Sequence, residues 1–103
     1  RRYDEARIAL ETALAASPDA AILWTDLGSL YARPLNNKPK AIEAFRAALK
    51  HDPSLAGTHF ALGTLLAETG ARAEGEKELA EAARLAEHPG MGSALPVRGD
   101  RAA

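Results

Sequence analysis

The sequence predicts an all-α fold, an α-solenoid of stacked antiparallel helical hairpins. Three observations predict this class. Alanine, the best helix former, recurs along the whole chain. The period-two alternation of β-branched residues that a strand needs is almost absent, and Val97 is the only valine. Finally, one set of apolar residues returns 35 residues further along the chain, as in proteins built from helical repeats.

The repeat has two registers of apolar and small residues. Ala6, Leu10, Ala13, Leu14 and Pro18 correspond to Ala41, Phe45, Ala48, Leu49 and Pro53, while Trp24, Leu27, Gly28 and Tyr31 correspond to His59, Leu62, Gly63 and Leu66. Because the registers alternate, the repeating unit is a hairpin of two different helices. Glycine inside a helix costs about 1 kcal/mol relative to alanine. We therefore interpret Gly28 and Gly63 as points where a neighbouring helix approaches the backbone closely.

Turn-forming residues divide the chain into five predicted helices. They are placed near 3–16, 20–33, 39–51, 55–69 and 71–87. Asp19 and Ser54 are predicted to cap the second and fourth helices. Pro39 suits the first turn of the third helix, and Gly70 suits a left-handed turn before the fifth.

Eight residues carry a family resemblance. The pattern Trp24-x2-Leu27-Gly28-x2-Tyr31, followed by Ala41-x3-Phe45-x2-Ala48 and Pro53, resembles one complete tetratricopeptide repeat. The resemblance covers about two and a half repeats: the second helix of a truncated repeat (1–18), a full repeat (20–54) and a degenerate repeat (55–88). In the degenerate copy His59, Gly75 and Leu79 replace the family's tryptophan, alanine and phenylalanine. One residue is inserted in the loop 33–38 of the full repeat relative to the usual family spacing.

The tail, residues 89–103, does not continue the repeat. We expect a linker or a disordered end, because Pro96 falls where the next leucine would be. Alternatively, Met91, Leu95 and Val97 cover apolar surface on the last hairpin.

The resemblance implies a concave wall lined by the first helix of each repeat. On this sequence the wall would carry two stripes: Ile22, Thr25, Ser29 and Arg33, then Gly57, Phe60, Thr64 and Ala67. The candidate peptide-binding residues are Ile22, Thr25, Ser29, Arg33, Phe60 and Thr64. The stripes are largely small and uncharged, which favours an extended segment or a helix with apolar anchors.

Two of these residues also have a plain structural interpretation. Phe60 is either the main ligand anchor or a core side chain covered by a helix or the tail. Arg33 is either a ligand contact or a solvated cation that stabilises a helix end. Some family members hold a terminal carboxylate with lysine, asparagine and arginine on this wall, and the corresponding positions here lack that clamp.

The resulting functional hypothesis is a non-catalytic protein–protein interaction module in a larger scaffold or assembly protein. One alternative is an accessory repeat region of a multidomain enzyme. Another is a pentatricopeptide-like RNA binder, because that family also has 35-residue helical hairpins. The 13 basic and 14 acidic residues nearly cancel, leaving a formal charge of −1, which disfavours nucleic acid as a partner.

No catalytic, metal-binding or cofactor-binding pattern stands out, so we expect no cofactor. The chain has no cysteine, and the spacing of His51, His59 and His88 matches no local metal-ligand motif. His59 is predicted to be a partly buried, hydrogen-bonded residue of the helix seam. The glutamates of 74–87 alternate with Arg72, Lys77 and Arg84, which indicates a solvated helix face rather than paired catalytic carboxylates.

The sequence also bears on membrane insertion, on the cellular compartment and on self-association. No apolar run approaches the roughly 20 residues that cross a bilayer, so we expect no membrane insertion. The compartment stays open, with the cytoplasm favoured over the periplasm. Because the repeat pattern gives the first helix no hairpin partner, we expect Tyr3, Ile8 and Leu10 to expose apolar surface, which makes self-association possible.

Overall fold

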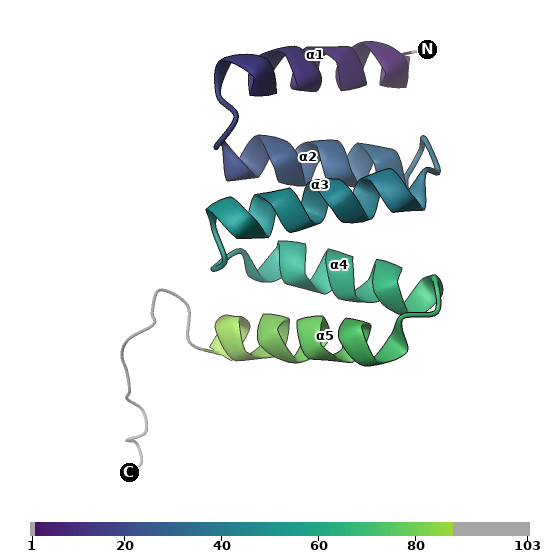
Figure 1. Ribbon diagram of the computed structural model, residues 1–103, viewed down its shortest axis with the longest axis vertical. Helices are drawn as coiled ribbons and strands as arrows, with labels where there is room; N and C mark the ends of the chain where they lie inside the picture. Colours follow the sequence, from purple (N-terminus) through teal and green to yellow (C-terminus); the bar gives the residue numbers. More distant parts are fainter. Residues whose placement is uncertain (1, 88–103) are drawn as a thin grey trace.

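The computed structural model describes residues 2–87, which form five α-helices and no strand. The helices are α1 (Arg2–Ala16), α2 (Ala21–Ala32), α3 (Lys38–His51), α4 (Ala56–Glu68) and α5 (Arg72–Glu87). Each runs antiparallel to the next (Figure 1). Every boundary lies within one residue of its predicted position, and the all-α class is confirmed. The expectations for residues 89–103 lie outside the described residues.

The helices are paired as two hairpins. α2 packs most extensively on α3, and α4 on α5, while α1 packs on α2 (Figure 1). The backbones of α2 and α4 also approach each other, whereas among the described helices those of α1 and α3, and of α3 and α5, do not. The stack is therefore tighter on the side of α2 and α4, and we call this its inner side.

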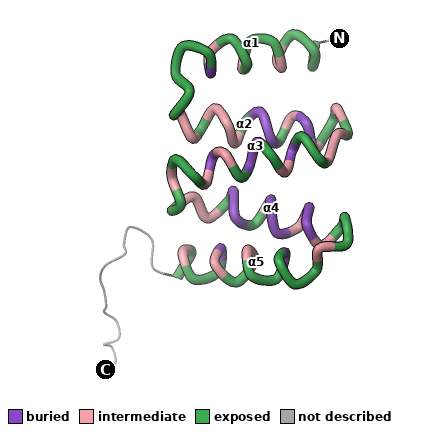
Figure 2. Tube along the Cα trace, in the orientation of Figure 1, coloured by how far each residue is buried: buried purple, intermediate pink, exposed green. Residues whose placement is uncertain are grey.

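The core lies along the three central helices. Buried positions concentrate on α2, α3 and α4, while α1 buries only Leu14 (Figure 2). Phe45 and Leu62 are the largest fully buried side chains in the described part of the chain. Alanines beside them, among them Ala41 and Ala48, are completely buried and leave room for the larger residues.

The helical glycines do mark close approaches, as the sequence predicts. A Cβ atom on Gly28 would lie 2.7 Å from the Phe45 ring. A Cβ atom on Gly63 would lie 2.8 Å from the carbonyl oxygen of Gly75, and one on Gly75 would lie 2.7 Å from the carbonyl oxygen of Gly63. Ordinary side chains do not tolerate such distances. In the second hairpin, therefore, two backbones meet directly.

The seam position held by tryptophan in one repeat and histidine in the next keeps one function. The Trp24 indole N–H donates to the carbonyl oxygen of Pro18 at 2.7 Å, and His59 Nε2 lies 2.8 Å from the carbonyl oxygen of Pro53. Each ring thus holds the loop that leads into its own helix. The second ring nitrogen, His59 Nδ1, lies 2.6 Å from Glu78 Oε1 on α5. His59 is hydrogen-bonded at the seam as predicted, and at 8% exposed it is buried rather than partly buried.

The capping prediction for Asp19 and Ser54 is wrong. α2 and α4 each begin one residue later than predicted, so Ala20 and Leu55 occupy their N-caps and provide no side-chain hydrogen bond. Ser54 instead donates its amide and its hydroxyl to the Asp52 carboxylate. Both hydrogen bonds lower the pKa of Asp52, and the bond from the Ser54 hydroxyl has the larger effect.

The other two turn predictions are confirmed, and one cap was missed. Pro39 lies in the first turn of α3, and Gly70 has φ +100°. α3 is capped by Asn37, whose side-chain oxygen accepts from the Lys40 amide at 3.2 Å.

Candidate functional site

A groove lies on the inner side, between the C-terminal half of α2 and the stretch of α4 from Phe60 to Glu68. Its main hollow has a volume of about 260 Å³. The hollow is lined by Ser29, Ala32, Arg33, Phe45, Phe60, Ala61, Thr64, Leu65 and Glu68. Four predicted contacts, Ser29, Arg33, Phe60 and Thr64, therefore lie together on its walls. Small side chains on both helices keep this space open, because alanine and serine reach only a short way from their backbones.

Phe60 is the outstanding side chain of this groove. It is 61% exposed, so none of residues 2–87 covers it. The only other phenylalanine in the hollow, Phe45, is 1% exposed and belongs to the floor. Full burial of a large aromatic side chain is worth about 1.5–3 kcal/mol relative to exposure. Any apolar group that covers Phe60 therefore stabilises the complex by removing its ring from water.

Thr25 and Ile22 do not line this hollow. The Thr25 hydroxyl forms a 2.8 Å hydrogen bond with the hydroxyl of Thr58, joining α2 to α4 in a half-buried position. Ile22 lies in the first turn of α2, at the other end of the helix, and is 59% exposed. Thr64 does line the hollow, but its hydroxyl already donates to the carbonyl oxygen of Phe60 at 2.9 Å. The hydroxyl groups of Thr25 and Thr64 thus already form hydrogen bonds within the protein.

A smaller recess adjoins the hollow at the end of α2. Its volume is about 200 Å³, and it is lined by Ala32, Arg33, Asn36, Lys38, Leu65 and Glu68. Four of these residues also line the main hollow, so the two spaces form one groove. Lys38 Nζ lies 3.4 Å from Glu68 Oε1, and this pair ties the start of α3 to the end of α4. The groove therefore has an apolar end and a charged end.

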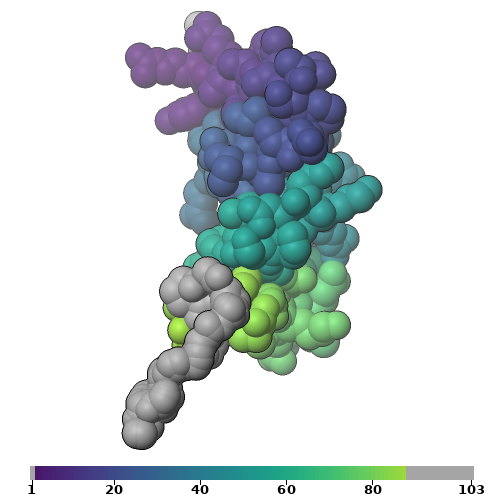
Figure 3. Space-filling view, turned by 90° about the vertical axis from the view of Figure 1, so that its left-hand side faces the viewer, coloured from purple at the N-terminus to yellow at the C-terminus, as the bar shows by residue number. Residues whose placement is uncertain are grey.

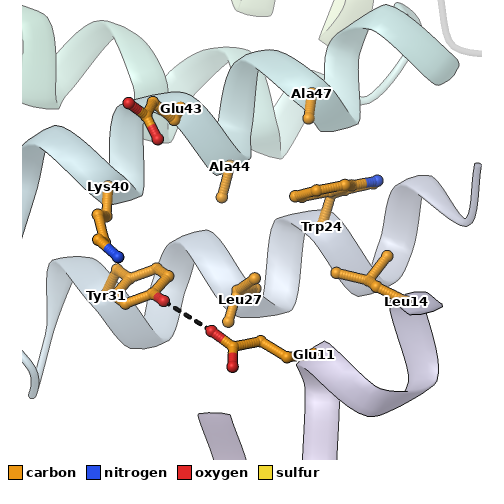
Figure 4. Close-up of a pocket in the computed structure, with 9 residues that line it drawn as sticks. All are labelled: Glu11, Leu14, Trp24, Leu27, Tyr31, Lys40, Glu43, Ala44 and Ala47. Carbon is orange, nitrogen blue, oxygen red and sulfur yellow. Dashed lines mark hydrogen bonds between the residues drawn. The ribbon is translucent and has the colours of Figure 1, made fainter. Parts of the chain in front are cut away.

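A second hollow, of about 400 Å³, lies between α1, α2 and α3 (Figure 4). Its walls include Leu14, Leu27 and Ala44, with Trp24 at one end and Tyr31 at the other. The Tyr31 hydroxyl donates to Glu11 at 2.9 Å, and Lys40 Nζ lies 5.6 Å from the centre of the Tyr31 ring. Burial, followed by the hydrogen bond to Glu11, raises the pKa of Tyr31. This arrangement ties α1 to the first hairpin.

The titratable residues of α5 are used for packing or stay in solvent. Glu78 contacts His59, and Glu74 forms an ion pair with Arg46 of α3 at 2.5 Å. The hydrogen bond from Arg84 lowers the pKa of Glu81. Within residues 2–87 no group of three or more histidine, aspartate or glutamate side chains is arranged to hold a metal ion. None of the five described helices is long and apolar enough to span a membrane.

These observations define the class: an α-solenoid of stacked hairpins with a groove between the first helices of successive units. Residues 21–55 match the model of the tetratricopeptide repeat family. The chain therefore contains a tetratricopeptide repeat within a helical array of that type, as the residue pattern predicted. No curated protein matches the sequence.

Solved structures with this arrangement include several of MamA. One MamA crystal structure is 25% identical, with a TM-score of 0.79 over 84% of this chain and 50% of the MamA chain. A MamA fragment from Desulfovibrio magneticus RS-1 is also 25% identical, with a TM-score of 0.78 over 89% of this chain and 50% of the other. The chain thus spans about half the length of these structures.

The sequence pattern does not indicate that several other residues line the groove. Ala32, Ala61 and Leu65 appear as ordinary helix positions, and Glu68 appears as a solvated helix end. Asn36 and Lys38 belong to the loop after α2 and the start of α3, and only the folded path of that loop brings them to the recess. For Glu68 a signal existed, because it lies four residues after Thr64 and so continues the Phe60–Thr64 stripe.

Proposed function

We propose that this chain is a non-catalytic module that binds a segment of another protein in the groove between α2 and α4. The exposure of Phe60 on a groove wall carries this proposal. An extended or helical segment would place an apolar side chain against Phe60 and exclude water from the alanine-lined wall. Tetratricopeptide repeats in general bind proteins or peptides, which supports the same conclusion. A place in a larger scaffold or assembly protein fits this function.

Replacing Phe60 by alanine tests the groove. We expect the wild-type chain to enrich a family of peptides from a displayed library of random short sequences. Phe60→Ala should weaken binding of synthetic copies at least about tenfold, because a central aromatic anchor commonly contributes a large share of binding energy. Fluorescence polarisation measures the affinity. Ile22→Asp should weaken binding less, since Ile22 does not line the hollow.

Ile8→Ala is the matched control for this experiment. Ile8 is 54% exposed, much like Phe60, but it belongs to α1 and lies outside the groove. Its truncation should leave peptide affinity unchanged. Equal affinities of the wild type and Phe60→Ala for every enriched peptide would refute the groove assignment. Circular dichroism of each variant shows that a loss of binding does not reflect unfolding.

We also propose that α1 mediates self-association. Its side chains stand out at one end of the stack (Figure 3), and Tyr3 is 53% exposed. Ile8 is 54% exposed, and no other described helix covers either of these two apolar side chains. We expect light scattering to detect dimers of the wild-type chain at micromolar concentration. The double variant Tyr3→Ser/Ile8→Ser should be monomeric, and a wild-type monomer at the highest soluble concentration would contradict the proposal.

The two alternatives predict different observations. An accessory region of a multidomain enzyme would be recognised from the sequence on either side of this chain. A single-strand RNA binder needs a cationic track with stacking aromatics along it. In residues 2–87, however, the groove offers one exposed aromatic residue, and one of its two cations is paired with Glu68. We therefore favour a protein segment over RNA.

A further inference from the structure

The loop between α2 and α3 distinguishes this groove from a simple repeat. Ala41 lies 13 positions after Gly28, whereas the equivalent Gly75 lies 12 positions after Gly63. The longer loop folds back over the end of α2. The Leu35 amide donates to the carbonyl oxygen of Leu30 at 3.1 Å, and the Asn37 amide donates to that of Tyr31 at 2.6 Å.

This path places polar side chains at the end of the groove. Arg33, Asn36 and Lys38 all line the recess beyond the apolar hollow. The corresponding loop of the second hairpin, residues 69–71, has no arginine or lysine, whereas Lys38 at the start of α3 has a counterpart in Arg72 at the start of α5. The loop with the one-residue insertion thus adds Arg33 and Asn36 to the recess.

The recess carries a net positive charge. Lys38 is paired with Glu68, and within residues 2–87 the Arg33 guanidinium forms no ion pair. The carbonyls of Leu30 and Tyr31 at the end of α2 already accept amides from the loop, which reduces their effect as a negative helix end. A guanidinium beside a partly enclosed space suits a carboxylate, which it can bind through two parallel hydrogen bonds.

We propose that this recess binds a carboxylate of the partner, so that the groove selects acidic segments with an apolar anchor. The proposal rests on the proposed function, because it needs a segment in the groove with its anchor against Phe60. Along α4, Phe60 and Glu68 are eight residues apart, or about 12 Å. An extended chain covers that distance in about four residues. The partner motif is therefore an apolar side chain and an acidic one about four residues apart.

A nucleic acid is the other anionic partner to consider. Its affinity would come from several phosphate contacts along a basic track. The recess offers a single unpaired guanidinium among the described residues, and the adjoining hollow is apolar. A peptide that carries both an apolar and an acidic group fits both the apolar hollow and the charged recess. A polynucleotide fits only the charged recess.

The test uses peptides enriched on the wild-type chain from the random library. We expect them to share an apolar residue with Asp or Glu about four positions away. Exchange of that acid for Lys in the synthetic peptide should weaken wild-type binding about tenfold, as expected for the loss of a charge-assisted contact. On Arg33→Glu the preference should reverse, with the Lys peptide binding more tightly than the Glu peptide. Polarisation titrations at two salt concentrations measure both effects.

Lys50→Glu is the matched control. It makes the same charge reversal on an exposed residue near the opposite end of α3, about 18 Å from Lys38 along that helix, and should leave the acidic preference intact. Enriched peptides that depend on Phe60 but bind equally with Glu or Lys would overturn this inference and leave the proposed function standing. Peptides that ignore Phe60 would overturn both. Tighter binding of a mixed-sequence single-stranded oligonucleotide than of any acidic peptide would also overturn it.

Discussion

Replacing Phe45 by alanine is expected to remove a large part of the stability of this chain. Phe45 is 1% exposed, lies at the centre of the core and packs against the backbone of Gly28. Truncation of a buried phenylalanine commonly costs about 3–5 kcal/mol, because the lost contacts leave a cavity. A domain of this size has a total stability on the order of 5–15 kcal/mol. The variant should therefore unfold at a much lower temperature, or be largely unfolded at ambient temperature.

Phe60→Ala makes the same chemical change on an exposed residue and is the natural control. Its effect on the free energy of unfolding should stay within about 0.5 kcal/mol, as for most surface substitutions. Phe45→Leu should fall between the two, since leucine already serves at the equivalent position Leu79. Thermal and urea unfolding followed by far-UV circular dichroism measure all three. Similar losses for Phe45→Ala and Phe60→Ala would mean that the core is not centred on Phe45.

The fold follows closely from the sequence because two independent signals coincide. Apolar stripes at helical spacing, such as Trp24, Leu27 and Tyr31, indicate the helices, and the turn residues between them mark the ends. Each hairpin repeats the arrangement of the last, so one good match constrains its neighbours. Caps were less predictable. A shift of one residue at the start of α2 or α4 moves the N-cap from Asp19 or Ser54 to a residue without a side-chain acceptor.

The candidate site was less predictable than the fold, because it depends on how two helices are placed relative to each other. Residues three or four apart share a helix face, which is why Ser29 and Arg33, or Phe60 and Thr64, lie on common walls. The contact between Thr25 and Thr58 depends on how α2 and α4 face each other, and no local pattern encodes it. The recess depends on the course of an inserted loop. Local periodicity thus predicts which residues share a helix face. Tertiary packing decides which of these positions stay exposed in the groove.

Replacing Gly75 by alanine is expected to destabilise the second hairpin, although it restores the residue that the tetratricopeptide pattern favours at this position. The new methyl group would lie 2.7 Å from the carbonyl oxygen of Gly63 and 3.0 Å from the amide nitrogen of Ala67. Both are backbone atoms of α4, so relief requires α4 and α5 to move apart. Overpacking of this kind costs about 1–3 kcal/mol. That loss outweighs the gain of about 1 kcal/mol in helix propensity.

Gly57→Ala separates these two effects. Gly57 lies in the first turn of α4, and a Cβ atom there would meet nothing within 4 Å. This variant should therefore keep the propensity gain without the collision and should raise the unfolding temperature slightly. Urea unfolding compares the two directly, and a more stable Gly75→Ala protein would show that α4 and α5 are not in backbone contact. In that case Gly75 would be only a tolerated departure from the family pattern. The distances indicate instead that Gly75 is the packing partner of Gly63. Gly28 packs against the Phe45 ring in the first hairpin and Gly63 packs against a second glycine in the next, so the departure from the pattern is itself a packing solution.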